Sequence, residues 1–161
     1  SDKENGMKKL MCVLLCVICI SSLVGCGKNS SELDFSETIR SIDFSMTLDS
    51  VKNSANDTLT EEKTAKGQNA FLYYEGELNG YSGEIIYRFD ADTGTLDFIK
   101  FIFNSDTDFE SYMDTFKETY GEPSKVSGDS EMWYGVVGGE NAVFATYQDS
   151  MGNAMVEVDK K

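Results

Sequence analysis

The chain contains no histidine among its 161 residues, and none of its four cysteines lies beyond Cys26. Without histidine there is no Ser-His-Asp or Cys-His catalytic arrangement and no metal site that includes histidine. Because the cysteines all lie in the first 26 residues, the rest of the chain has no disulfide, and its stability must come from packing. We also find no catalytic or cofactor motif, so we expect neither an enzyme nor a cofactor.

Positive charge is scarce. The chain has 28 acidic residues against 14 lysines and arginines, which gives a net charge of −14. Such a charge argues against binding nucleic acid and against lying flat on anionic lipid. Solubility is the simplest explanation for the excess of acid, and divalent cations or a basic partner are the alternatives.

Long apolar runs are also missing, apart from one of eleven residues at Leu10–Ile20 that follows Lys8 and Lys9. It is too short for an ordinary membrane-spanning helix and has the length of a signal-peptide core. The following Leu23-Val24-Gly25-Cys26 (23–26) resembles the lipobox of bacterial lipoproteins. That resemblance implies a diacylglycerol on the Cys26 thiol and cleavage before it. An uncleaved anchor and an ordinary secretory signal are the alternatives.

These features predict the organisation of the chain. Residues 1–6 look like a cloning remnant, 7–25 like a lipoprotein signal peptide and 26–34 like a flexible tether. Residues 35–161 have the length of a single domain with a core of its own. The lipobox resemblance implies a domain anchored by lipid to the outer face of a membrane in the bacterial cell envelope.

Two helices are predicted. Thr47 can cap a short helix over 48–54. Thr107 and Glu110 have the spacing of a capping box for a helix over 108–120, and a glycine and a proline follow its end. The second helix carries one apolar stripe, which consists of Phe109, Tyr112, Met113, Phe116 and Tyr120.

Strand-like runs with turn residues between them predict strands; 81–89 alternates apolar and polar residues, and 95–103 is apolar on both faces apart from Lys100, as expected of a central strand. The first segment of the domain, with Phe35, Ile39 and Ile42, fits either a helical turn or a short edge strand, and 55–69 is predicted to be an exposed loop. The predicted fold is α+β: an antiparallel sheet of five to six strands in two three-stranded meanders, with two helices packed on one face. The predicted strands are 70–78, 81–89, 95–103, 131–137, 141–148 and 153–159.

The two halves show a hidden similarity. Segments 89–98 and 147–156 align without gaps at an offset of 58 residues, and each half is a helix followed by three strands. This pattern predicts either a duplicated α-β-β-β unit or two meanders with similar turns.

Two short segments carry a family resemblance. Residues 44–52, FSMTLDSVK, resemble the helix entry of the small outer-membrane-assembly lipoproteins and of the β-lactamase-inhibitor-protein repeat, and 120–123, YGEP, is similar to the helix end of those repeats. The resemblance implies an α+β fold and a protein-binding role. The chain departs from the pattern at 55–69, where those families place a second helix, and it lacks their glycine before Met46. No family partner is therefore carried over.

Three acidic clusters invite a chemical interpretation. Asp90, Asp92 and Gly94 resemble the start of a calcium loop, but the later ligand positions are missing, which favours a hairpin turn. Asp106 and Asp108 lie where acidic residues favour the start of a helix. On neighbouring strands, three glutamates can form a carboxylate pair for glycoside hydrolysis or lie on a solvated sheet face; these are Glu75, Glu77 and Glu84.

Aromatic residues on the strands are the most informative surface candidates, because tyrosine and tryptophan are favoured at interfaces. Alternate members must fill the core under the helices. We select Trp133, provided that it points away from the helices, together with Tyr73, Tyr74 and Tyr81. Together with the lipobox resemblance, these residues predict a lipid-anchored extracytoplasmic module whose sheet face or loop 55–69 binds a protein partner of unknown identity, another protein of the envelope or a secreted one. A small-ligand or peptide sensor is the alternative, and a carboxylate- or metal-dependent enzyme is less favoured.

Overall fold

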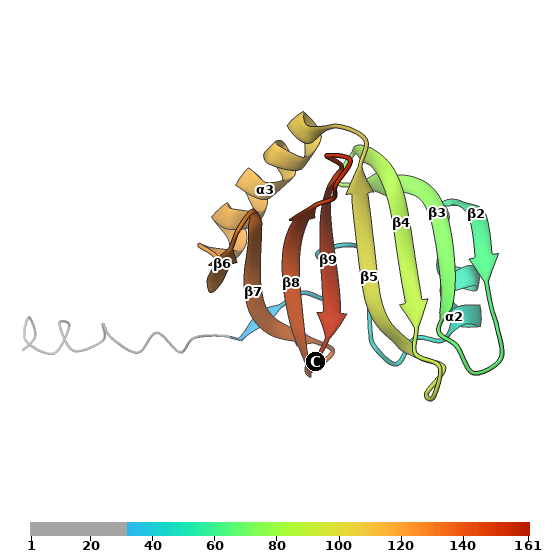
Figure 1. The fold of residues 1–161 in the computed structure, drawn as a ribbon. Helices are drawn as coiled ribbons and strands as arrows, with labels where there is room; N and C mark the ends of the chain where they lie inside the picture. Colours follow the sequence, from blue (N-terminus) through green and yellow to red (C-terminus); the bar gives the residue numbers. More distant parts are fainter. Residues whose placement is uncertain (1–31) are drawn as a thin grey trace, which may run out of the picture. The chain divides into compact units, whose positions relative to one another are not determined.

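Nine strands and two helices make up most of residues 32–161, the part of the chain that the computed structural model describes (Figure 1). The predictions for residues 1–31, including the signal peptide and Cys26, lie outside the described residues. The elements are β1 (Leu33–Asp34), α2 (Leu48–Ser54), β2 (Thr58–Lys63), β3 (Ala70–Leu78), β4 (Tyr81–Phe89), β5 (Leu96–Phe103), α3 (Asp106–Tyr120), β6 (Lys125–Ser127), β7 (Ser130–Val137), β8 (Glu140–Gln148) and β9 (Ala154–Lys160).

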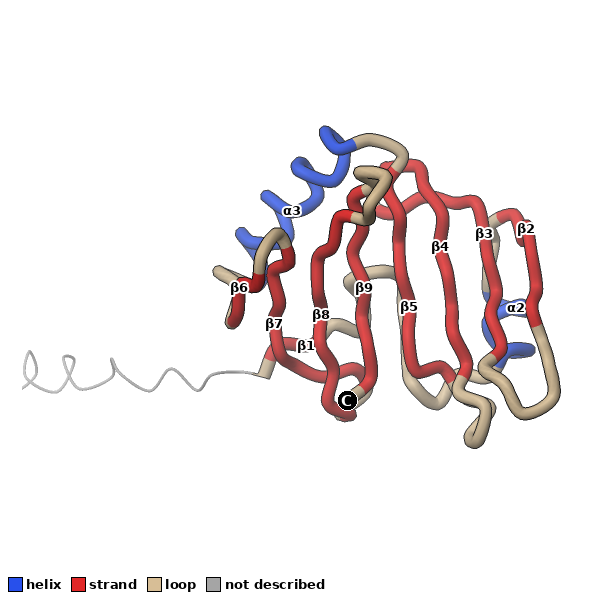
Figure 2. Tube along the Cα trace, in the orientation of Figure 1, coloured by secondary structure: helices blue, strands red, loops and turns tan. Residues whose placement is uncertain are grey.

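The strands form one sheet in the order β1-β7-β8-β9-β5-β4-β3-β2, and β6 also pairs with β7 (Figure 2). The two predicted meanders, β3-β4-β5 and β7-β8-β9, are present, and an antiparallel pairing of β5 with β9 joins them. The α+β class is confirmed. The prediction of five to six strands and a purely antiparallel sheet was wrong, because β1 pairs with β7 in parallel and the short strands β2 and β6 extend the edges.

Two of the three missed strands, β2 and β6, share a reason. Every residue of β2 and β6 is exposed, so neither strand carries the apolar alternation by which a strand is recognised in a sequence. Residues 58–63, predicted to be part of a loop, become a strand because they pair with β3, and Thr60 Oγ1 also donates to Tyr73 O at 3.0 Å. Leu33 and Asp34, predicted to be tether, pair with β7.

The helix predictions were right in position and partly wrong in capping. Thr47 caps α2, with Ser50 as its capping-box partner: Ser50 N donates to Thr47 Oγ1, and Thr47 N donates to Ser50 Oγ. In α3 the cap is Ser105 rather than Thr107, because the Ser105 hydroxyl accepts from Asp108 N at 3.2 Å. The helix therefore begins two residues earlier than predicted.

Both helices pack on the same face of the sheet. On α3, the Phe116 ring stacks on Phe144 of β8 at 4.0 Å, and Tyr112 lies 5.4 Å from Phe103 of β5. Val51 of α2 is buried in the same core. In Figure 1 α2 lies behind the strands, so the viewer faces the side of the sheet that the helices leave uncovered.

The two halves have the same order of elements, a helix followed by four strands. Leu48 and Asp106 begin the two helices, 58 residues apart, and the strands that follow begin at corresponding positions, for example Ala70 and Ser130, 60 apart. The halves meet at the antiparallel β5–β9 pair, which relates them by an approximate two-fold axis. This is the geometry expected of a duplicated unit, with a fourth strand in each half that the sequence did not indicate.

Candidate functional site

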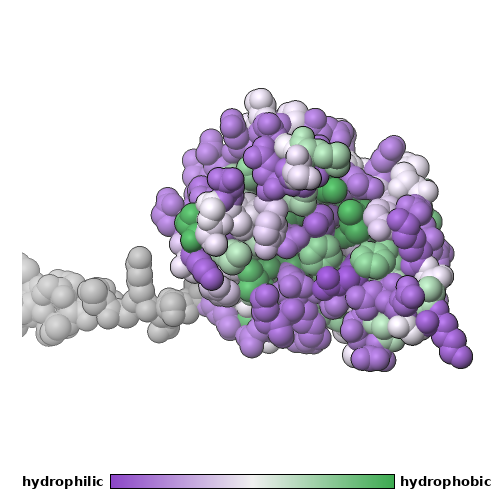
Figure 3. Space-filling model, viewed as in Figure 1, coloured by the Kyte–Doolittle hydropathy of each residue, from purple (hydrophilic) through white to green (hydrophobic). Residues whose placement is uncertain are grey.

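The face of the sheet opposite the helices is the candidate site, and we call it the open face. Strand pairing places Tyr73 opposite Ile86, Ile86 opposite Lys100, and Lys100 opposite Glu157, all on this side. Figure 3 shows apolar surface across the middle of the open face, with polar surface around it. The exposed and half-buried apolar members are Phe71, Tyr73, Ile86, Phe98, Ile102, Tyr134 and Tyr147; Val143 and Met155 lie on the same side of the sheet but are buried.

Ion pairs cross the centre of the open face. Arg88 Nε lies 2.9 Å from Asp97 Oδ1, and Arg88 Nη2 lies 3.1 Å from Asp159 Oδ1. Lys100 Nζ lies 3.4 Å from Glu157 Oε2. The cations also cover an aromatic ring: the Arg88 guanidinium lies 4.7 Å from the centroid of Phe98. The centre of the face is therefore apolar with its charges neutralised, which lowers the cost of removing it from water when a partner binds.

The carboxylate of Glu157 is the most perturbed acid of the open face. Burial raises its pKa above the ordinary value, and the nearby Lys100 ammonium works in the opposite direction. Because burial is the main cause of this raised pKa, the surface around Glu157 is already partly shielded from solvent.

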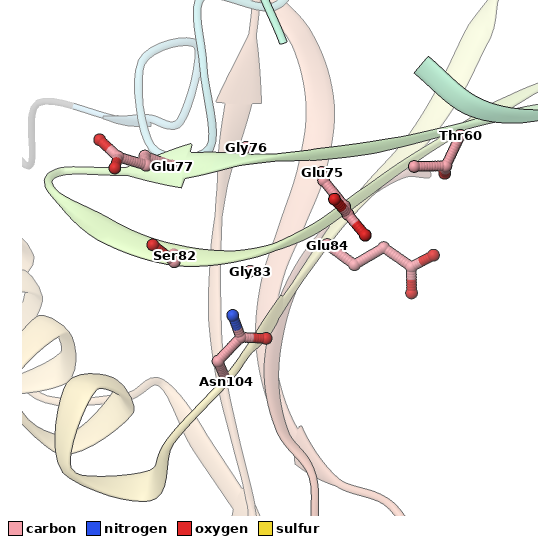
Figure 4. A pocket seen from close by; sticks show the side chains of 8 residues that line it. All are labelled: Thr60, Glu75, Gly76, Glu77, Ser82, Gly83, Glu84 and Asn104. Atoms are coloured by element: carbon pink, nitrogen blue, oxygen red, sulfur yellow. The ribbon is translucent and has the colours of Figure 1, made fainter. Parts of the chain in front are cut away.

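One end of the open face is hollowed. A depression of about 720 Å³ lies over the ends of β3 and β4, and its lining includes Glu75, Glu77 and Glu84. Figure 4 shows the side chains of Glu75 and Glu84 extending together from the two strands, with Glu77 nearer the hairpin end. The register makes Glu75 and Glu84 direct neighbours. Within residues 32–161 no lysine or arginine nitrogen lies within 4 Å of these three carboxylates.

Three of the four selected aromatic residues do not lie on the open face. Trp133 is fully buried, packs edge-on against Phe116 and Phe144, and donates its Nε1–H to Gly121 O at 2.9 Å. Tyr74 is buried on the helix side, and Tyr81 packs against the core.

Tyr73 is on the open face. It stacks on Phe71, and Lys63 Nζ lies 4.5 Å from its ring centroid.

Trp133, in contrast, points toward the helices, because β7 contributes side chains to the core under α3.

The aromatic residues that are most exposed on this face were among the candidates on the predicted strands but not among the four selected. Tyr134 and Tyr147 retain 51% and 37% of their accessible surface. The signal was present: side chains alternate along a strand, so Tyr134 must face away from the core once Trp133 faces it. Choosing between the two faces required knowing which one α3 covers.

The remaining acidic candidates have structural explanations. Asp90 accepts from the backbone N–H groups of Asp92 and Thr93 in the turn after β4, and these hydrogen bonds lower its pKa. Asp106 and Asp108 lie in the first turn of α3. Residues 32–161 contain no group of three or more histidine, cysteine, aspartate or glutamate side chains arranged to hold a metal ion.

The chain was also compared with known proteins. No protein-family model matches it, and searches of curated proteins and of solved structures find no match either. Across residues 32–161, neither helix has the length and apolar character needed to cross a membrane. A functional interpretation must therefore be built from the residues of this chain.

Proposed function

We propose that this chain is a lipid-anchored extracytoplasmic binding module, attached through Cys26, that uses the open face to bind another protein of the bacterial cell envelope. The observation that carries the proposal is the open face itself. It is a broad sheet surface with apolar and aromatic side chains at its centre, and no helix of residues 32–161 packs on it. Uncovered apolar surface of this kind marks interaction sites in soluble domains.

The composition of the face supports a protein partner. Exposed tyrosines such as Tyr134 and Tyr147 combine an apolar ring with a polar hydroxyl group. In an interface the ring can be buried against the partner while the hydroxyl group forms a hydrogen bond to the partner or to water. The alternative, a sensor of a small ligand, has less support, because small-ligand sites are enclosed and mostly apolar, whereas the hollow at the end of this face is an open depression with carboxylates in its lining.

The proposed anchor restricts where the partner can be. Seven residue steps separate Cys26 from Leu33, the first residue of β1. Even a fully extended chain of that length spans only about 25 Å. In this proposal the domain stays close to the membrane, and its partner is a membrane protein or a protein held near the membrane.

Photo-crosslinking in intact cells tests the proposal. A photoreactive phenylalanine analogue replaces Tyr134 or Tyr147 on the open face, and Thr115 on the exposed side of α3 serves as the control position. We expect a discrete crosslinked protein from the open face and none from the control. Absence of crosslinks at both tyrosine positions, or equal crosslinking from position 115, would refute the proposal.

A further inference from the structure

One row of side chains crosses the hollowed end of the open face. The register places Glu75 beside Glu84, Glu84 beside Ile102, Ile102 beside Met155, and Met155 beside Tyr147. We call these five residues the cross-strand row. It runs over β3, β4, β5, β9 and β8 from two carboxylates, through Ile102 and the buried Met155, to the exposed ring of Tyr147. With neighbouring strands about 4.8 Å apart, it is roughly 19 Å long.

The charge along this row is unbalanced, in contrast to the rest of the open face. Arg88 and Lys100 neutralise the carboxylates at the centre, whereas no cation of residues 32–161 lies within 4 Å of Glu75 or Glu84. Like charges directly opposite on paired strands destabilise a sheet. A partner that brings basic side chains to this end removes the repulsion while its apolar side covers Ile102.

We propose that the cross-strand row is the docking site for a basic amphipathic helix of the partner protein. Lysine or arginine side chains at one end of that helix lie over Glu75 and Glu84, and its apolar side packs on Ile102 and Tyr147, which remain accessible on either side of the buried Met155. A row of roughly 19 Å matches a helix of about 13 residues. This inference rests on the proposed function and adds the chemistry of the partner.

Charge complementarity selects this occupant over two others. A second copy of the chain would bring another net charge of −14 to the same surface. A partner strand would need an edge rather than a face, and the outer edge strand β2 carries Glu61, Glu62 and Lys63, side chains that discourage strand addition. A helix instead covers an apolar sheet face, as α2 and α3 do on the other side.

A designed peptide tests the docking chemistry directly. The probe is a fluorescein-labelled 14-residue helix of leucine and lysine, with leucine on one face, and its counterpart has glutamate in place of lysine. Binding to the full 161-residue chain is followed by fluorescence anisotropy. We expect Glu75→Gln/Glu84→Gln to weaken binding of the basic peptide about tenfold. We expect Tyr147→Ala to weaken it by a similar factor.

The matched control is Asp114→Asn/Glu118→Gln, which removes the same charge from the exposed side of α3. We expect its effect to stay within about twofold, because it changes net charge without touching the row. Equal losses in the two double variants would mean that net charge alone attracts the peptide, and the inference would be wrong. Binding of the acidic peptide with similar affinity would overturn it too.

The two proposals can fail separately. Crosslinks from Tyr134 or Tyr147, together with peptide binding that ignores the cross-strand row, would leave the open face as an interface and reject the basic helix. Row-dependent peptide binding without any crosslink from the open face in cells would reject the proposed function. Far-UV circular dichroism and thermal melts of each variant establish that a lost interaction is not a lost fold.

Discussion

Removing the Phe116 ring should test the packing on which the assignment of the open face depends. Phe116 is 4% exposed and lies at the centre of an aromatic cluster: its ring stacks on Phe144 at 4.0 Å, meets Trp133 edge-on at 5.0 Å and lies 4.5 Å from Tyr120. Phe116→Ala leaves a cavity under the middle of α3. A buried Phe-to-Ala change typically costs about 3–5 kcal/mol.

That loss is large relative to the stability of a domain without disulfides, which is typically about 5–15 kcal/mol. For a domain of this size it corresponds to a drop in Tm of roughly 10–20 °C. Urea denaturation measures it well, because the chain has a single tryptophan and Trp133 lies inside the affected cluster. Far-UV circular dichroism provides a second probe, since the substitution itself changes the surroundings of Trp133.

The control needs care. Lys117, the next residue, is half-buried, and its Nζ lies 2.8 Å from Glu131 Oε2, so replacing it would also break an ion pair. Glu118 is exposed on α3 and takes part in none of the ion pairs of residues 32–161, so Glu118→Ala should cost under about 0.5 kcal/mol. Similar losses for Phe116→Ala and Glu118→Ala would mean that α3 does not cover this face, and the open face would be wrongly assigned.

Three other changes give distinct expectations. Cys26→Ser should abolish lipid labelling and release the protein from the membrane fraction; unchanged labelling would refute the lipobox interpretation. Tyr112→Phe should cost about 1–2 kcal/mol in a denaturant melt, because Tyr112 Oη donates to Thr38 O at 2.7 Å in the core; no measurable loss would contradict this. Because the pKa of Glu157 is raised in the fold, its ionisation costs stability as pH rises from the unfolded pKa through the folded one. Glu157→Gln should thus gain stability relative to the parent between pH 4 and pH 7 in urea melts, and a constant difference would show that the carboxylate titrates normally.

Much of the fold follows from local patterns. The capped helix at Leu48, the apolar stripe of α3 and the six strand-like runs between turn residues were enough to predict these elements and the two meanders, because these signals depend only on the spacing of apolar residues and on turn chemistry. The edge strand β2 could not be found in this way. Its six residues are all exposed, and only pairing with β3 makes them a strand.

The sequence by itself determined the strong excess of acid, the absence of histidine chemistry and the residues that alternate along each strand, and it predicts a lipidation signal at Cys26. Only the tertiary structure decided which alternate set is buried. The choice depends on the face to which α3 brings Phe116, and it sends Trp133 inward and Tyr134 outward, although they are neighbours in the same strand. Successive side chains on a strand point to opposite faces of the sheet. The face that α3 covers therefore determines which alternate set of side chains is buried and which is exposed.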